Sequence, residues 1–387
     1  MNKKDQYFRL NKTLLLIVGL WPYQQSLFTT FQYIFISTIL ISFVACQLTT
    51  FLTLKCTLEL FLKVFCPVSF FVVILIKYNL FYFRLKSVKN LLMLAFYVQN
   101  ELKDKNEIAI IKKYDCISRR FTVGLTSKMA TCSICGVNIM QFWLYIFHIN
   151  LLPANVSRFD HLPFEMEYFI DKRKYIYLIT LHVCAAVCVG PFVLMAIGAM
   201  MIAYIHFTCG MFTIASYRIK NAINFNIQKR ITSKSKIWMT EGIICGINIH
   251  RQAIKFVFLM TTFTMWCDLL KRQSVSNTLF QLVSSKNDIG KFYLSFMISS
   301  ACTVYMFLAN LMGQIVIDHN NNVYTTAYNA QWFKTPLHMQ KMILFILQRR
   351  TKDFSLNIGG LFDASMEGFS TLVKASVTYF TVMHSTR

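Results

Sequence analysis

Charge of either sign is scarce in this chain of 387 residues, and acidic side chains are the scarcest. Charged residues make up 15% of the sequence and hydrophobic ones 55%, with 17 Asp and Glu against 40 Lys and Arg. A soluble protein of this length could not bury so large an apolar fraction in one core, so the composition predicts a membrane protein. The net charge of +23 does not indicate nucleic-acid binding, because the basic residues lie between apolar blocks rather than on an aromatic-laced face.

Catalytic and metal-binding motifs are also missing. The sequence has no phosphate loop, nucleophile elbow, zinc-helix motif or paired-carboxylate site, so we expect no enzyme and no cofactor. Most of the 12 cysteines lie inside apolar blocks, where a thiol behaves as a small hydrophobic group. Cys132 and Cys135 have CxxC spacing and Cys184 precedes Cys188 by one turn, but no second cysteine pair lies close to either of them. Helix packing therefore explains these spacings better than a metal site.

Seven apolar blocks approach the length of about 20 residues that a helix needs to cross a bilayer. The expected spans are residues 31–52, 58–83, 123–149, 175–210, 256–282, 292–317 and 357–383. Helical segments on the solvent side are expected at residues 84–120, 218–255 and 323–352, and 332–352 has one apolar face. The chain is thus predicted to be an all-α membrane protein with a single seven-transmembrane domain.

Three of these spans carry a feature that needs explanation. Residues 175–217 hold no charge and could form two spans, but Gly190-Pro191 is the only break, so we favour one long helix. Lys77 lies near the end of the second span, where a long side chain can snorkel to the interface. The fifth span contains Asp268, Lys271 and Arg272, and inserting each of these charges near the centre of a span costs about 2.5–3.5 kcal/mol. Asp268 can pair with Lys271 at i, i+3 and with Arg272 at i, i+4, which lowers the cost of insertion.

The basic residues predict the orientation of the chain. With the N-terminus in the cytosol, the inside segments hold 26 Lys and Arg and the outside segments hold 8. Because cytosolic loops carry the excess of positive charge, the N-terminus is predicted inside and the C-terminus, after seven spans, outside. The loop after the third span would then face outward, and its sequon at Asn155 is a candidate for glycosylation.

The last 33 residues contain a polar stripe. On a helix these positions lie alternately four and three residues apart, which places them on one face: Asp363, Glu367, Ser370, Lys374, Val377 and Thr381. Thr371 and Thr378 lie beside them. Lipid cannot satisfy polar side chains, so a membrane-length helix with such a stripe needs water or polar partners along it. The stripe predicts a pore wall.

Several motifs in the C-terminal part of the chain follow one another in an order and at a spacing that are typical of a known family. They are Met306-Phe-Leu-Ala-Asn310 with Asp318-His319, Ala327-Tyr-Asn-Ala-Gln-Trp-Phe333, Gly359-Gly-Leu-Phe362, Met366-Glu-Gly-Phe369 and Val377-Thr-Tyr-Phe-Thr381. Together with the inverted seven-span plan they resemble insect odorant receptors, particularly the expanded type of ants, bees and wasps. The resemblance extends over nearly the whole chain and is strongest near its end.

The resemblance implies a subunit of a tetrameric, ligand-gated, non-selective cation channel that is assembled with the odorant receptor co-receptor. It implies a multi-pass protein of the plasma membrane, in the dendrite of an olfactory sensory neuron. In that family the last helix lines the pore, cytosolic segments form a shared anchor, and a hydrophobic constriction precedes a Thr-Tyr-Phe triplet, which here is Val377. The implied pore residues are Glu367, Lys374, Val377, Thr378 and Thr381. Lys374 is a departure, since its positive charge opposes cations unless Glu367 or another subunit screens it.

The family binds small volatile or cuticular odorants in the outer half, among spans 2, 3, 4 and 6. An apolar cavity with a few polar groups is suited to such ligands. Candidates in those positions are Phe65, Phe70, Met140, Trp143, Phe147, His182, Phe296 and Tyr305. For each one alone, ordinary helix packing is the competing explanation.

Two other functions remain open. A gustatory-type chemosensory channel shares Thr378-Tyr379, although the Gln-Phe that usually follows is replaced by Met383-His384. A secondary transporter would show inverted repetition between spans 1–3 and 4–6, which the sequence does not display.

Overall fold

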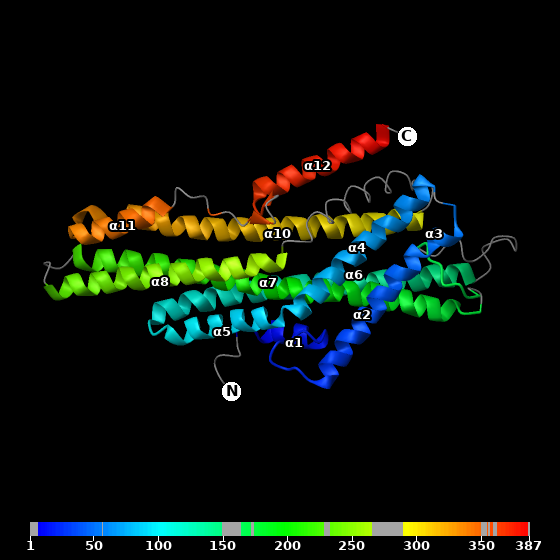
Figure 1. The fold of residues 1–387 in the computed structure, drawn as a ribbon, viewed down its shortest axis with the longest axis horizontal. Helices are drawn as coiled ribbons and strands as arrows, with labels where there is room; N and C mark the ends of the chain where they lie inside the picture. The colour runs from blue at the N-terminus through cyan, green and yellow to red at the C-terminus, as the bar shows by residue number, and fades with distance from the viewer. Residues whose placement is uncertain are drawn as a thin grey trace.

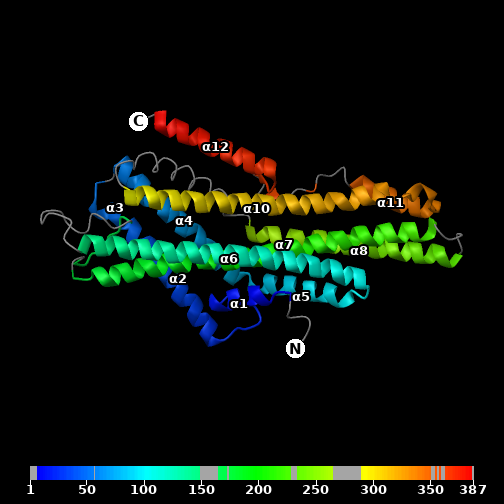
Figure 2. The ribbon, with the colours of Figure 1, turned by 180° about the vertical axis from the view of Figure 1, so that it is seen from behind.

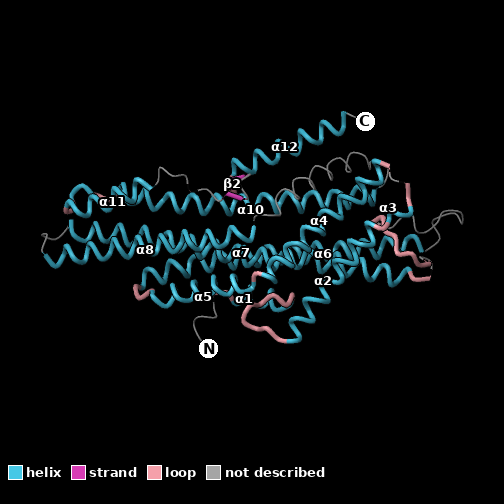
Figure 3. Tube along the Cα trace, viewed as in Figure 1, coloured by secondary structure: helices cyan, strands magenta, loops and turns pink. Residues whose placement is uncertain are grey.

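The computed structural model describes residues 7–55, 57–148, 164–171, 174–227, 233–264, 289–349, 354, 357–358 and 362–385. These residues form an elongated bundle of helices with one pair of very short strands (Figures 1 and 3). The helices are α1 (Arg9–Ile17), α2 (Leu27–Leu48), α3 (Thr50–Thr53), α4 (Leu58–Phe83), α5 (Leu85–Glu101), α6 (Lys105–His148), α7 (Ile176–Ile227), α8 (Ser233–Thr264), α10 (Ile289–Asn329), α11 (Leu337–Arg349) and α12 (Met366–Ser385). The predicted all-α class is confirmed.

Helices α6, α7, α8 and α10 run along the long axis of the bundle, while α2 and α4 cross it obliquely (Figures 1 and 2). α6, α7 and α10 contain 44, 52 and 41 residues. At about 1.5 Å per residue each is at least about 60 Å long, twice the hydrocarbon thickness of about 30 Å. Each of these helices is therefore too long to lie within the hydrocarbon layer alone.

Helix α7 is the centre of the packing and contacts α8, α6, α10, α4, α2 and α1. Residues spaced three or four apart along it are fully buried, so one apolar stripe faces the core: Val193, Ala196, Met200, Tyr204, Phe207 and Met211. The helix continues through Pro191, which confirms one long helix rather than two spans. A side chain at Gly190 would meet the Phe71 ring at 3.0 Å, so this glycine lets α4 approach α7 closely.

Five segments of the described chain are long and apolar enough to cross a membrane: Leu27–Thr53, Lys63–Phe83, Ile176–Asn224, Ile237–Met260 and Ser299–Asn329. Four of them lie largely within expected spans, whereas Ile237–Met260 lies mostly in the segment 218–255, which was expected on the solvent side, and overlaps the fifth expected span only at residues 256–260. Most of the fifth expected span, with Asp268, Lys271 and Arg272, lies outside the described residues, as does Asn155. The count of seven spans and their exact limits stay predictions.

The expected amphipathic helix at 332–352 is shorter than predicted. A 3-10 turn (η2, Trp332–Lys334) precedes α11, which begins at Leu337, directly after Pro336. The residue before a proline is disfavoured in helical conformation, so the proline separates the two elements. Met339, Ile343 and Ile346 lie on one face of α11 and are buried, which confirms that the apolar face expected for this segment packs against the rest of the protein.

The terminal helix also begins later than predicted, and this is a correction. Asn357–Ile358 (β1) pairs in antiparallel fashion with Phe362–Asp363 (β2), so Asp363 is not on the helix. α12 starts at Met366 because the Ser365 side chain caps it, its Oγ accepting a hydrogen bond from the Gly368 N–H at 3.0 Å. The remaining 20 residues are about 30 Å long, which still matches a bilayer.

Candidate functional site: the terminal helix and the polar clusters beside it

Helix α12 has one face packed on α10 and another that is open. Leu372 and Ser376 are 4% and 1% exposed, and the Phe369 ring lies 5.5 Å from that of Phe307 on α10. The five predicted pore residues Glu367, Lys374, Val377, Thr378 and Thr381 are all exposed, with Val377 at 48%. In Figure 1, α12 leaves the middle of α10 and diverges from the bundle. The polar stripe therefore lies on a helix, and the rest of the described chain leaves it uncovered.

The hydroxyl groups of this stripe are oriented by their own helix. Thr371 Oγ1 donates to the Glu367 carbonyl at 3.1 Å, Thr378 Oγ1 to Lys374 at 3.0 Å, and Thr381 Oγ1 to Thr378 at 2.7 Å. Each hydroxyl gives its proton to the backbone and keeps only acceptor lone pairs for whatever lies beyond. A row of acceptors is suited to water and cations.

Lys374 is the exception on this face. Its side chain is exposed, and within the described residues it forms no ion pair with Glu367, two turns earlier. An ammonium among the hydroxyl acceptors introduces a local positive charge, and none of the described residues forms an ion pair with it.

The start of α12 fits tightly against α10. A Cβ at Gly313 of α10 would lie 2.2 Å from the Ala364 carbonyl oxygen, and one at Gly368 would lie 2.2 Å from that of Asp363. The Met366 N–H donates to Gln314 Oε1 at 3.3 Å, and Gln314 Nε2 donates to Asp318 Oδ1 at 2.8 Å. This junction ties the terminal helix to α10 at one end.

Five of the eight predicted ligand residues can be placed with their side chains. Phe65 and Phe70 are half-buried on α4, His182 is half-buried on α7, and Tyr305 is half-buried and Phe296 exposed on α10. The side chains of Met140, Trp143 and Phe147 on α6 lie outside the described part of the chain. Hydrogen bonds bring His182 and Tyr305 into two separate polar clusters.

The first cluster holds His182 between two hydroxyl groups. Its Nε2 lies 2.8 Å from Ser42 Oγ on α2, and its Nδ1 lies 2.8 Å from the Tyr168 hydroxyl, in the segment 164–171. Burial raises the pKa of the Tyr168 phenol, which keeps it protonated. The same segment is fastened to α2, since the Glu167 N–H donates to the Cys46 carbonyl at 2.9 Å. Ser42 and Tyr168 were not predicted, because no local pattern links them to His182.

The second cluster joins Lys77 on α4 to Tyr305 on α10. Lys77 Nζ donates to the Tyr305 hydroxyl and also lies 4.2 Å from the centre of its ring. Lys77 is only 8% exposed, so the expectation that it snorkels to the interface is wrong. A charge inside the membrane costs about 2.5–3.5 kcal/mol, and the electron-rich ring face offsets part of this.

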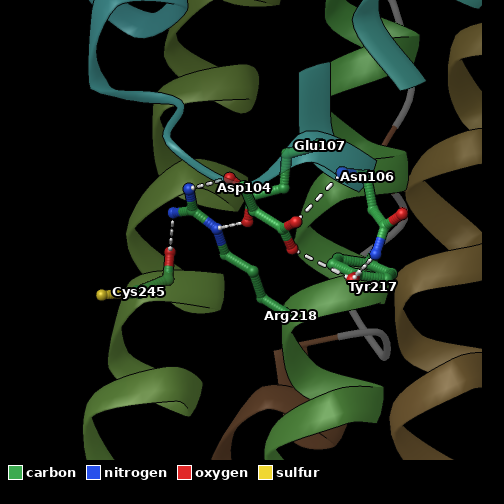
Figure 4. A network of polar contacts seen from close by, with 6 residues as sticks. All are labelled: Asp104, Asn106, Glu107, Tyr217, Arg218 and Cys245. Atoms are coloured by element: carbon green, nitrogen blue, oxygen red, sulfur yellow. Dashed lines mark hydrogen bonds and ion pairs between the residues drawn. The ribbon is translucent and has the colours of Figure 1, made fainter. Parts of the chain in front are cut away.

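A third polar network lies where α6 begins (Figure 4). Arg218 on α7 forms a two-point ion pair with Glu107, at 2.6 Å and 2.9 Å, and also donates to the Cys245 carbonyl on α8 at 3.4 Å. The Tyr217 hydroxyl donates to Asp104 Oδ2 at 3.0 Å and accepts from Asn106 at 2.7 Å. Two further turns along α6, burial raises the pKa of the Asp115 carboxyl although the adjacent Arg119 opposes this. The network joins three helices in the part of the bundle expected to be cytosolic.

Cysteines and metal ligands contribute no site to the described part of the chain. Cys184 and Cys188 on α7 form no disulfide bond, and no group of three or more His, Cys, Asp or Glu side chains in the described residues is arranged to hold a metal ion. The side chains of Cys132 and Cys135 are outside the described part.

Solved structures define the class to which this fold belongs. The chain superposes over its full length on olfactory receptor OR5 of Machilis hrabei in complex with eugenol, with a TM-score of 0.71 and 14% identity, covering 100% of both chains. A second structure of the same receptor matches with a TM-score of 0.73 over 99% of this chain and 98% of that one. The fold is that of an insect olfactory receptor.

Sequence comparison then identifies the family. The sequence profile of the 7tm odorant receptor family matches residues 57–377, and the chain belongs to this family, which is one of receptors rather than enzymes. Odorant receptor 10 of Aedes albopictus is 26% identical over 44% of this chain, and the odorant receptor coreceptor of the same mosquito is 20% identical over 44%. The chain spans less than half of these relatives, 42% and 36% of their lengths.

Proposed function

We propose that the chain is the odorant-binding subunit of a ligand-gated, non-selective cation channel formed with the odorant receptor co-receptor. The observation that carries this proposal is the open face of α12. A membrane-length helix that exposes Glu367, Thr371, Thr378 and Thr381 is unstable against lipid, and it is satisfied when several copies surround water. The similarity to both odorant receptors and co-receptors supports such an assembly.

Val377 is the gate of the proposed pore. It is the apolar position on the exposed stripe between Lys374 and Thr378. A ring of such side chains from several subunits closes a channel by excluding water, so opening requires only a small widening of the ring. Contact with α10 at Phe307 and at the Gly313 junction supports α10 as the element that moves α12.

The proposed placement puts the N-terminus and the polar network of Figure 4 in the cytosol, and the segment 164–171 outside. The excess of basic residues in the inside segments supports this direction. The long helices α6, α7 and α10 then continue below the membrane as the anchor, in the plasma membrane of an olfactory neuron dendrite.

Expression of the chain with the co-receptor in cultured cells, with current recording over an odorant panel, tests this proposal. Odorant-evoked cation currents that need both subunits are expected. Uptake of a compound without conductance would instead assign the chain to a transporter and defeat the proposal.

Replacing Val377 by Ala tests the gate. The smaller side chain widens the apolar ring, so we expect ligand-independent leak current to rise several-fold at equal surface expression. Val382→Ala is a matched control, because Val382 is also exposed on α12, at 54%, but lies beyond the expected constriction. Equal leak in both variants and the unmodified channel would remove Val377 from the gate.

A further inference from the structure

Lys77 is a buried ammonium that neither the pore nor the anchor uses. It lies on α4 among buried apolar residues one turn away, namely Val73, Ile74 and Phe81. Its contacts in the described part of the chain are the hydrogen bond to Tyr305 and the position of Nζ 4.2 Å from that ring's centre. No carboxylate of the described residues pairs with it.

Beyond the Tyr305 hydroxyl, the Lys77 ammonium lacks hydrogen-bond acceptors and a counter-charge among the described residues. An ammonium has three N–H donors, and the Tyr305 hydroxyl satisfies one of them. A buried charge is retained at low cost only when a counter-charge and hydrogen-bond acceptors surround it. A carboxylate supplies both, since it is negatively charged and carries acceptor oxygens only.

The location is suited to a ligand. α4 and α10 are not among the helix pairs whose backbones pack closely, and Lys77 and Tyr305 meet between them through long side chains. Helical side chains lean toward the N-terminal end of their helix, so the ammonium of Lys77 reaches from near the inner end of the second expected span back toward its middle. Two residues after Tyr305, Phe307 contacts Phe369 of α12, and α10 therefore lies between this pair and the terminal helix.

We propose that Lys77 and Tyr305 form a polar anchor in the ligand site that selects odorants carrying a carboxylate on an apolar chain. The inference rests on the proposed function, because it names the ligand class of that receptor. The carboxylate accepts from the two remaining N–H groups of Lys77, and the apolar chain lies along the hydrophobic surfaces of α4 and α10.

The test compares nonanoate, methyl nonanoate and 1-nonanol, which share chain length and differ in charge. In cells that express the receptor with the co-receptor, nonanoate is expected to act at concentrations at least tenfold lower than the ester. Lys77→Met keeps the length of the side chain without its charge, and the acid-to-ester potency ratio is expected to fall at least tenfold. Lys77→Arg keeps the charge and is expected to retain the preference for the acid.

A second measurement is independent of channel activity. Nonanoate is expected to raise the melting temperature of the purified receptor in detergent more than the ester does, and Lys77→Met is expected to abolish that difference. If Lys77→Met does not reach the cell surface, Lys77→Gln replaces it in both assays. Equal potency and equal thermal shift of acid and ester in the unmodified receptor would overturn the inference. A thermal shift that depends on Lys77 without any odorant-evoked current would uphold it and defeat the channel proposal.

Discussion

Arg218 and Glu107 fasten the start of α6 to α7 through an ion pair that is largely shielded from water. The Glu107 side chain is 7% exposed and the Arg218 side chain 23%. Removing one member of a buried pair leaves the other charge without compensation, which costs about 3–5 kcal/mol. Because Arg218 keeps some exposure, we expect Glu107→Gln to lower the free energy of unfolding by about 3 kcal/mol, at the lower end of that range. Thermal unfolding of the purified receptor measures the effect.

Asp115→Asn is the matched control for this change. Asp115 pairs with Arg119 within the same helix at i, i+4, and the Arg119 side chain is 38% exposed. The Asp115 side chain is 18% exposed, and burial already disfavours its charged form, which offsets the gain from the pair. Pairs at i, i+4 contribute about 0.3–0.5 kcal/mol, so only a small change in melting temperature is expected. If both variants unfold at the same temperature, the Glu107 pair does not hold the helices together.

At the scale of elements, the junction between α10 and α12 decides whether movement of one helix reaches the other. A Cβ at Gly313 would lie 2.2 Å from the Ala364 carbonyl oxygen and 2.6 Å from its Cβ. Gly313→Ala must therefore displace the segment before α12, at a cost of about 1–3 kcal/mol for an overpacked contact. We expect odorant-evoked current to fall at least tenfold at equal surface expression.

Gly198→Ala serves as the comparison for this substitution. Gly198 also lies inside a long helix, α7, and nothing within 4 Å would meet an added Cβ there. Alanine in place of a helical glycine stabilises by about 0.5–1 kcal/mol, so normal currents are expected. Loss of current in both variants would mean that the effect is not specific to the junction.

The sequence was informative about elements and less so about their partners. The long α7 helix follows from a run of residues without charge, and the polar stripe of α12 follows from the spacing of its polar residues. Both features are present in the structure. The hairpin that contains Asp363 was missed, because pairing across Gly359-Gly360 leaves no periodic signal. Lys77 was misplaced for a related reason: its position near a span end is local information, whereas its partner Tyr305 lies 228 residues further along the chain.

For the whole molecule, the direction of the chain through the membrane is the central prediction. An epitope tag at the C-terminus is expected to be labelled on intact cells, and a tag at the N-terminus only after permeabilisation. Staining of the N-terminal tag on intact cells would reverse the orientation and place the segment 164–171 in the cytosol. The same assay, repeated with the Glu107→Gln receptor, reports whether weakening the anchor disturbs insertion.

Helix α10 extends without a proline from Ile289 to Asn329 and meets a different neighbour at each level. Tyr305 touches α4, Phe307 touches α12, Gly313 lies against Ala364 just before α12, and Asn320 lies 2.9 Å from His250 of α8. Because α10 is one uninterrupted helix, a movement of α10 along its axis changes its contacts with α4, α12 and α8 together. In the proposed channel, ligand binding beside α4 and the packing of α10 against α8 are therefore expected to act on α12 through the same helix. A change in either is expected to alter how easily the proposed pore opens.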